Sequence, residues 1–176
     1  MSTNDTPTAA CFACGGRFAD IDGPTHRYMD STPGCWAAFG RVLEREYSDT
    51  RYFGVHRLTV DTYAVQHPGQ PSAQSIQSVG VHLIRLHLFL ERGLSAEQAN
   101  DAMLDAARFK KSFVRLEPPL HYAMTVADVF AASAPEQHQQ LVRAWAQSAW
   151  QAWSAHHDVV RQWAEQSGAV ASMRTR

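Results

Sequence analysis

Apolar residues recur at helical spacing along most of this chain. The first run predicts a helix over residues 35–47, where positions i, i+3, i+7 and i+11 are occupied by Trp36, Phe39, Leu43 and Tyr47. No run of about four to eight residues alternates convincingly between apolar and polar positions, as a half-buried strand does. The pattern therefore predicts an all-α body in the form of a mostly helical bundle.

The second predicted helix covers residues 55–66, after a connection over residues 48–54. Pro68 ends it, because proline disfavours α geometry at the preceding residue, and His67 is therefore expected at the helix end. If the first two helices form an antiparallel hairpin, Cys35 and His67 lie at equal distances from its turn. The two side chains would then face each other.

Residues that commonly begin or end helices predict further helices along the body. Ser72 and Ser95 are good N-cap residues for helices that end near residues 92 and 111, and Gly93 is a C-terminal signal. A short helix is expected over residues 125–132.

The last predicted helix is long, over residues 135–166, and Pro135 suits its first turn. Its apolar stripe includes His156, while Trp150 and Trp153 lie on an adjoining face. We interpret these tryptophans as core packing or as a contact between copies of the chain. The second interpretation leaves a homo-oligomer open.

Residues 1–34 have a different character, because Gly, Pro, Thr and Asp replace the helical pattern. Pairs such as Gly15-Gly16 and Pro33-Gly34 are typical of turns. We expect a loop-rich N-terminal arm over residues 1–34 and a helical body over residues 35–176. With 176 residues, the two parts together make one compact domain.

Composition narrows the choice of partner and compartment. Sixteen Lys and Arg against seventeen Asp and Glu give a net charge of -1, which argues against a nucleic-acid partner. The longest mostly apolar stretch, residues 79–90, is shorter than the ~20 residues that span a bilayer, so no membrane association is expected. Three cysteines and no export signal favour a reducing cytoplasm.

The cysteines are the most specific chemical signal. Cys11-Phe-Ala-Cys14-Gly-Gly is a knuckle whose glycines let backbone N–H groups turn toward two thiolates. With Cys35 and one histidine, these thiolates would complete a tetrahedral structural zinc site. One alternative is that the three cysteines bind no metal and are ordinary packing residues. A redox-active Cys11–Cys14 pair is less favoured, because no parallel sheet is predicted.

Three histidines compete for the fourth ligand position. His26 lies between the second and third cysteines and is therefore close to all three cysteines in the sequence. His67 is favoured by the predicted hairpin, which places it opposite Cys35. His56 lies near the turn of that hairpin, roughly 16 Å from His67 at ~1.5 Å rise per residue, and is the weakest of the three by this construction.

Three segments carry a resemblance to a known family. They are Cys11-x2-Cys14-Gly, Thr32-Pro-Gly-Cys-Trp36, and Val55-His-Arg-Leu-Thr-Val-Asp-Thr-Tyr63 with Gln66-His-Pro-Gly69. These segments resemble a bacterial family of unknown function. Relatives with a shorter arm lack an equivalent of His26 and keep the three cysteines and both later histidines, so the resemblance favours His67, or His56, as ligand. It implies metal binding and leaves any reaction open.

A small metal-dependent or histidine-dependent enzyme is the rival to a structural zinc protein. His56, His82 and His156, from three helices, would meet in an interior pocket, where Asp61 or Tyr63 would orient a ring or serve as acid, base or ligand. The alternative is that each histidine is a hydrogen-bonded core or interface residue. No P-loop, G-x-S-x-G or His-Glu-x-x-His motif occurs in the sequence.

Charged residues on the helices have ordinary interpretations. Glu44 and Glu46 are expected on solvated helix faces. An anion or an acidic partner could dock on the one basic cluster, which consists of Arg108, Lys110, Lys111 and Arg115. We interpret this cluster mainly as an exposed helix end that complements the helix dipole. The sequence thus predicts a non-enzymatic adaptor or regulatory module with structural zinc, whose partner is a protein or a small molecule.

Overall fold

Helices make up nearly all the regular structure of residues 7–167, the part of the chain that the computed structural model describes. The longer helices are α1 (Pro33–Ser48), α3 (His56–Gln66), α4 (Ala73–Leu90), α5 (Ala96–Phe109), α7 (Pro135–Ala152) and α8 (His157–Gln166). The shorter ones are α2 (Thr50–Phe53), α6 (Val126–Phe130) and the 3-10 turns η1 (Lys110–Ser112) and η2 (Ser154–His156). The predicted all-α class is confirmed.

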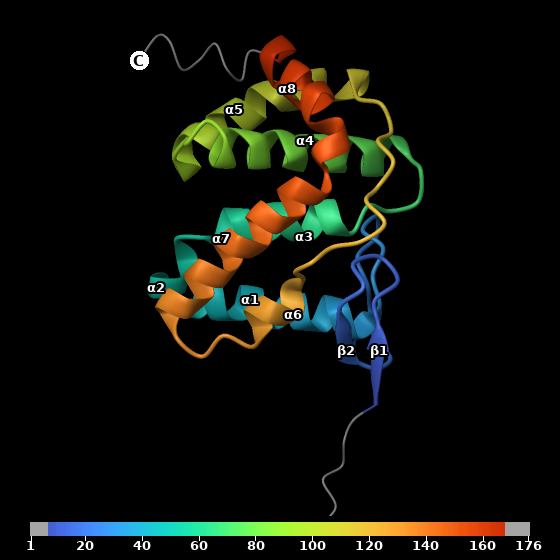
Figure 1. Ribbon diagram of the computed structural model, residues 1–176, viewed down its shortest axis with the longest axis vertical. Coiled ribbons are helices and arrows are strands. Elements are labelled where there is room, and N and C mark those ends of the chain that lie inside the picture. The colour runs from blue at the N-terminus through green and yellow to red at the C-terminus, as the bar shows by residue number, and fades with distance from the viewer. Residues whose placement is uncertain (1–6, 168–176) are drawn as a thin grey trace, which may run out of the picture.

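The helices form three tiers (Figure 1). α1 lies in the lowest tier with α6, α3 occupies the middle, and α4 lies above it beside α5 and α8. α7 crosses α3 diagonally and joins the lower tier to the upper one. Trp145, Trp150 and Trp153 of this crossing segment are buried, so the interpretation of the tryptophans as core packing is correct.

Helix starts follow the capping signals in the sequence. The Ser72 side chain accepts a hydrogen bond from the backbone N–H of Ser75, and Ser95 does the same for Gln98. Each forms a capping box that satisfies two otherwise unpaired donors of the first turn. Both predicted N-caps are therefore confirmed.

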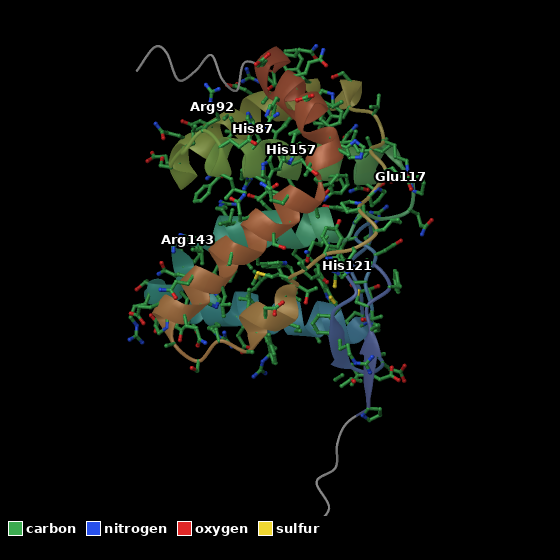
Figure 2. The ribbon with its side chains drawn as sticks, in the orientation of Figure 1. His87, Arg92, Glu117, His121, Arg143 and His157 are labelled. Atoms are coloured by element: carbon green, nitrogen blue, oxygen red, sulfur yellow. The ribbon has the colours of Figure 1, made fainter. Side chains whose placement is uncertain are left out.

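The C-terminal helix is broken, which corrects the single helix predicted over residues 135–166. α7 ends at Ala152, and η2 separates it from α8. His157 closes the break, since its Nε2 donates to the carbonyl oxygen of Trp150 at 2.9 Å and its ring stacks on that indole. The bend lets α7 pack on α3 while α8 packs on α4, near His87 (Figure 2).

The arm, predicted to be loop-rich, also contains two short strands. β1 (Thr8–Ala10) and β2 (Arg17–Ala19) pair antiparallel, with Ala9 opposite Phe18. The expected connection over residues 48–54 likewise contains α2. Three-residue strands and one-turn helices are too short to leave a periodic pattern in a sequence.

Close backbone contacts hold the arm against the body. A Cβ atom on Gly34, in the first turn of α1, would lie 2.0 Å from the carbonyl oxygen of Ala19, and one on Gly69 would lie 2.2 Å from that of Tyr28. Only glycine fits at these two positions. The arm therefore packs on the start of α1 and on the connection between α3 and α4.

Among the described helices, none combines the length and the apolar character that crossing a lipid bilayer requires.

Candidate metal centre

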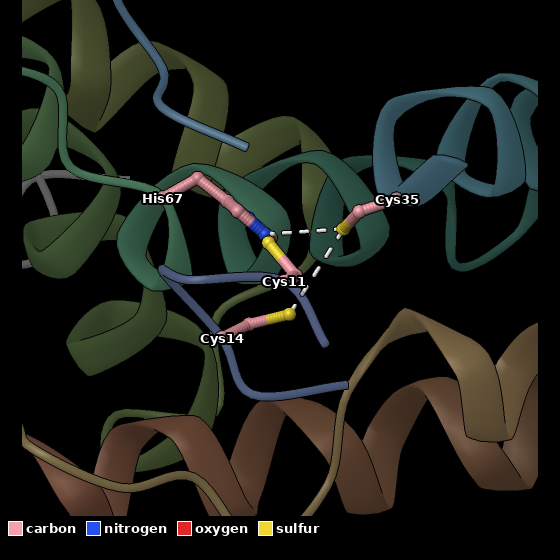
Figure 3. Close-up of side chains that lie close together, drawn as sticks. All are labelled: Cys11, Cys14, Cys35 and His67. Carbon is pink, nitrogen blue, oxygen red and sulfur yellow. Dashed lines mark hydrogen bonds between the residues drawn. The ribbon is translucent and has the colours of Figure 1, made fainter. Parts of the chain in front are cut away.

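Three cysteines and one histidine converge from three separate segments (Figure 3). Cys11 and Cys14 come from the turn between β1 and β2, Cys35 from the start of α1, and His67 from the end of α3. Their ligand atoms all lie within 4.8 Å of one another, and all four residues are buried. This is the combination of residues that the sequence singled out.

Backbone hydrogen bonds shape the knuckle. The N–H of Cys11 donates to the carbonyl oxygen of Gly16, and the N–H of Gly15 donates to that of Cys11, both at 2.8 Å. Gly15 has a φ of 78°, a left-handed conformation that glycine adopts without steric cost. The resulting tight turn carries Cys11 and Cys14 to the same side of the hairpin, facing the helical body.

Cys35 owes its position to the N-terminal cap of α1. The Thr32 hydroxyl accepts a hydrogen bond from the backbone N–H of Cys35 at 3.4 Å, and Pro33 occupies the first helical position. The thiol therefore lies in the first turn of the helix. The partial positive charge at that end of the helix would help to stabilise a thiolate, but it is outweighed by the neighbouring cysteines, which raise the pKa of Cys35.

His67 is oriented by its own helix. Its Nδ1 donates to the carbonyl oxygen of Tyr63 at 2.7 Å, so the lone pair of the neutral ring is at Nε2. That Nε2 lies 3.3 Å from the sulfur of Cys35, and the Tyr63 ring stacks on the imidazole at 3.9 Å. A backbone carbonyl on the far ring nitrogen is the usual support for a metal-binding histidine.

The three thiols compete for negative charge. The hydrogen bond from Cys14 holds the pKa of Cys11 far below its usual range, and the same bond raises the pKa of Cys14 to about 12. The hydrogen bond with Cys11 also raises the pKa of Cys35. The buried cluster therefore supports one thiolate by itself, and ionisation of the other two needs a cation close by.

Two of the distances between ligand atoms match those of a tetrahedral zinc ion. With Zn–S bonds of ~2.3 Å, two sulfurs of a tetrahedral site are ~3.8 Å apart. The sulfurs of Cys14 and Cys35 are 3.9 Å apart, and Cys35 and His67 are slightly closer at 3.3 Å, as the shorter Zn–N bond requires. Thiolate and imidazole ligands are those that zinc prefers. The residues present therefore fit this ion.

The comparison with protein families covers this whole site. A family model matches residues 9–154, which is most of the chain. The chain belongs to the family of unknown function DUF5946. The DUF5946 match contains all four residues of the cluster and ends within η2, so α8 lies outside it. No curated protein and no solved structure matches the sequence.

The alternative fourth ligand, His26, lies outside this cluster. Its ring packs against Tyr28 and Trp36, and its Nδ1 accepts from the backbone N–H of Tyr28 at 3.4 Å. Burial lowers the pKa of this histidine. The side chain therefore packs the arm onto the first helix.

His56 belongs to a different buried network, centred on Glu46. The Glu46 carboxylate accepts from His56 Nδ1 at 2.8 Å, from His138 Nε2 at 2.9 Å and from the Thr59 hydroxyl at 2.5 Å. Glu46 is 1% exposed, so its expected place on a solvated helix face is wrong. The partner that buries it, His138, comes from α7 and is remote in sequence.

His82 and Asp61 form a third pair. His82 Nδ1 donates to Asp61 at 2.7 Å, and the other oxygen of this buried carboxylate lies 3.3 Å from Nε of Arg85. Asp61 thus orients a histidine ring, which is one of the roles considered for it. Tyr63 instead lies beside Cys35 and His67, where burial raises the pKa of its hydroxyl.

His156 has yet another partner, since its Nε2 donates to the carbonyl oxygen of Glu117. The structure thus gives His56, His82 and His156 separate partners. Of the three, His82 lines an open hollow between α3, α4 and α5.

Proposed function

We propose that this protein is a zinc-binding module in which Cys11, Cys14, Cys35 and His67 hold one structural ion. The observation that carries the proposal is the convergence of these four buried side chains from three segments. The remaining ring nitrogen of His67 is bonded to the Tyr63 carbonyl, which is the arrangement usual for a metal-binding histidine and supports the proposal.

A structural role suits this donor set better than a catalytic one. Catalytic zinc usually has three protein ligands and an open position for water or substrate, whereas structural sites have four protein ligands. Here four protein atoms are available and all four residues are buried. The site leaves no position for a substrate, and this favours a non-enzymatic adaptor or regulatory role.

The ion would fasten the arm to the helical body. Few apolar side chains of the arm are buried in the core apart from its two cysteines, and Phe18 is the largest of these. Ordering each residue of such a segment costs about 1–2 kcal/mol of backbone entropy, which sparse apolar contacts do not offset. Metal–ligand bonds would supply the missing free energy.

A reducing compartment suits this arrangement, because all three cysteines are free thiols in the structure. We therefore place the module in the cytoplasm.

Chelation combined with hydrogen exchange tests the proposal. The protein would be purified under reducing conditions without added metal, analysed for zinc, and then treated with a chelator. We expect roughly one zinc per chain, and faster amide exchange at residues 8–19 after its removal, with α4 little changed. Unchanged exchange in the arm after complete removal of zinc would overturn the clamp. His26→Ala, which alters the arm outside the cluster, is the matched control.

A histidine-dependent enzyme is the second candidate function. One observation supports it: His82 is held by a buried carboxylate and lines an open hollow. An aspartate on Nδ1 is the arrangement that orients a general base.

A further inference from the structure

The hollow beside His82 has no role in the zinc proposal, and its charge is distinctive. It has a volume of about 430 Å³ and lies between α3, α4 and the end of α5. Arg57, Arg85 and Lys110 line it together with His82, and no Asp or Glu is among the described lining residues. A chain of net charge -1 thus concentrates three cations in one concave surface.

Two of these cations are free to bind a ligand. Arg57 and Lys110 are exposed, and within residues 7–167 neither side chain has an ion-pair or hydrogen-bond partner. Nearby Arg108, by contrast, forms an ion pair with Asp105. Positive charges that converge on a hollow without a carboxylate are typical of an oxyanion site.

The floor of the hollow is preorganised. Arg85 is 4% exposed and is held between the Asp61 carboxylate and the sulfur of Met103. Its buried Nε has no hydrogen bond of good geometry within the described residues. His82 is fixed through Nδ1 by the same Asp61, and no described residue pairs with its Nε2. Both groups can therefore meet a ligand with little loss of entropy.

We propose that this hollow binds a small molecule carrying a phosphate or carboxylate group. Arg57 and Lys110 would bind the anion at the rim, and Arg85 and His82 would contact it at the floor of the hollow. Side-chain donors of Gln74, Gln77 and Ser78 complete the polar wall, and the volume suits a metabolite-sized ligand. The basic cluster of the sequence thus contributes one residue, Lys110, to a defined site.

The arm also contributes to this site through Tyr28, which lines the hollow. Tyr28 is held in place where Gly69 packs on its backbone, and the side chain of Gln70 donates to Asp30 nearby. Anion binding rests on the cations of the helical body and stands independently of the proposed zinc. The metal would affect it only through the position of this one ring.

Nuclear magnetic resonance of the histidine rings tests the proposal on zinc-retaining full-length protein. Inorganic phosphate or acetate is titrated at constant ionic strength while the imidazole signals of His82 and of exposed His121 are followed (Figure 2). We expect a saturable shift at His82 with at least one of the two anions, and none at His121. The anion that binds more tightly identifies the preferred headgroup.

The double variant Arg57→Gln/Lys110→Gln is expected to weaken this binding at least tenfold, since it removes both rim charges. The fold should be kept, because both side chains are exposed and form no ion pair among the described residues. Arg143→Gln/Lys111→Gln removes the same charge outside the hollow and is the matched control. Equal weakening by the control, equal shifts at His121, or no saturable shift at His82 with either anion would overturn the site. Zinc content is measured in each variant, so a failure of the clamp is distinguished from a failure of the hollow.

Discussion

The Nε2 atom of His67 lies 3.3 Å from the sulfur of Cys35, although 32 positions separate the two residues in the sequence. This contact joins the end of α3 to the start of α1, and the knuckle of the arm closes over both. The proposed centre therefore links the arm to two helices that also meet through side chains, since Phe39 of α1 stacks on Tyr63 of α3. Loss of any one ligand is expected to loosen all three.

His67→Ala and His26→Ala separate the two ligand hypotheses. We expect His67→Ala to reduce zinc affinity by about tenfold or more, because a tetrahedral site with three protein ligands must recruit water in place of the imidazole. His26→Ala is expected to retain the affinity of the unchanged protein. Competition with a chromogenic chelator measures both. The opposite order of affinities would assign the fourth position to His26.

Gly34→Ala tests the close approach of the arm to α1. The added methyl group would lie 2.0 Å from the carbonyl oxygen of Ala19, a backbone atom that cannot move away cheaply. We expect a loss of about 2–3 kcal/mol in the free energy of unfolding. Gly40, in the same helix, has no atom within 4 Å of the added position, so Gly40→Ala is expected to stabilise by up to about 1 kcal/mol. Urea denaturation distinguishes the two, and equal effects would contradict the packing.

Glu46→Gln tests the buried network between α1, α3 and α7. The carboxylate accepts from two histidines and one threonine, and an amide would present a donor to one of those donors. We expect a loss of about 2–4 kcal/mol in unfolding free energy. Glu44→Gln, two positions away on an exposed face, is expected to change stability by less than about 0.5 kcal/mol. A comparable loss in the Glu44 variant would refute the assignment.

Glu91 makes stability depend on pH. Its hydrogen bond from Arg161 lowers the pKa of this carboxyl from 4.5 to about 2. Because the folded-state pKa is depressed, the stabilisation is complete above pH 4.5 and is lost as the pH falls toward 2. Solvent screening limits it to about 1 kcal/mol.

The difference in unfolding free energy between the unchanged protein and Glu91→Gln should therefore shrink as the pH falls from 4.5 toward 2. Taking the difference cancels any loss of metal that both proteins share. A control substitution, Glu165→Gln, lies on an exposed face of α8 and is expected to show no such trend. A constant difference across the interval would contradict the lowered pKa.

The convergence of the four candidate ligands was predictable because its signals are local or symmetric. The knuckle is a contiguous motif, and an antiparallel pair of helices brings positions equidistant from the turn together, which selected His67 as the partner of Cys35. The same reasoning fails for Glu46, because its partner His138 lies 92 positions away on α7. No local pattern distinguishes a buried carboxylate from a solvated one at a single helical position.

The break between α7 and α8 was also beyond the sequence pattern. The apolar stripe continues past Ala152 to His156 without proline or glycine, so spacing alone predicts one helix. The break is stabilised by a specific side-chain contact that hydrophobic spacing does not report: His157 stacks on Trp150 and donates to its carbonyl oxygen. The hollow beside His82 likewise depends on how α3, α4 and α5 meet, a relationship that no single helix pattern contains.

Zinc content before and after the loss of one thiol tests the central claim most directly. The unchanged protein and Cys35→Ser would be purified in parallel under reducing conditions without added metal, and analysed for zinc and for melting temperature. We predict about one zinc per chain in the unchanged protein, with much less zinc and a lower melting temperature in the variant. Equal zinc content and equal melting temperature in the two proteins would contradict the proposed metal clamp.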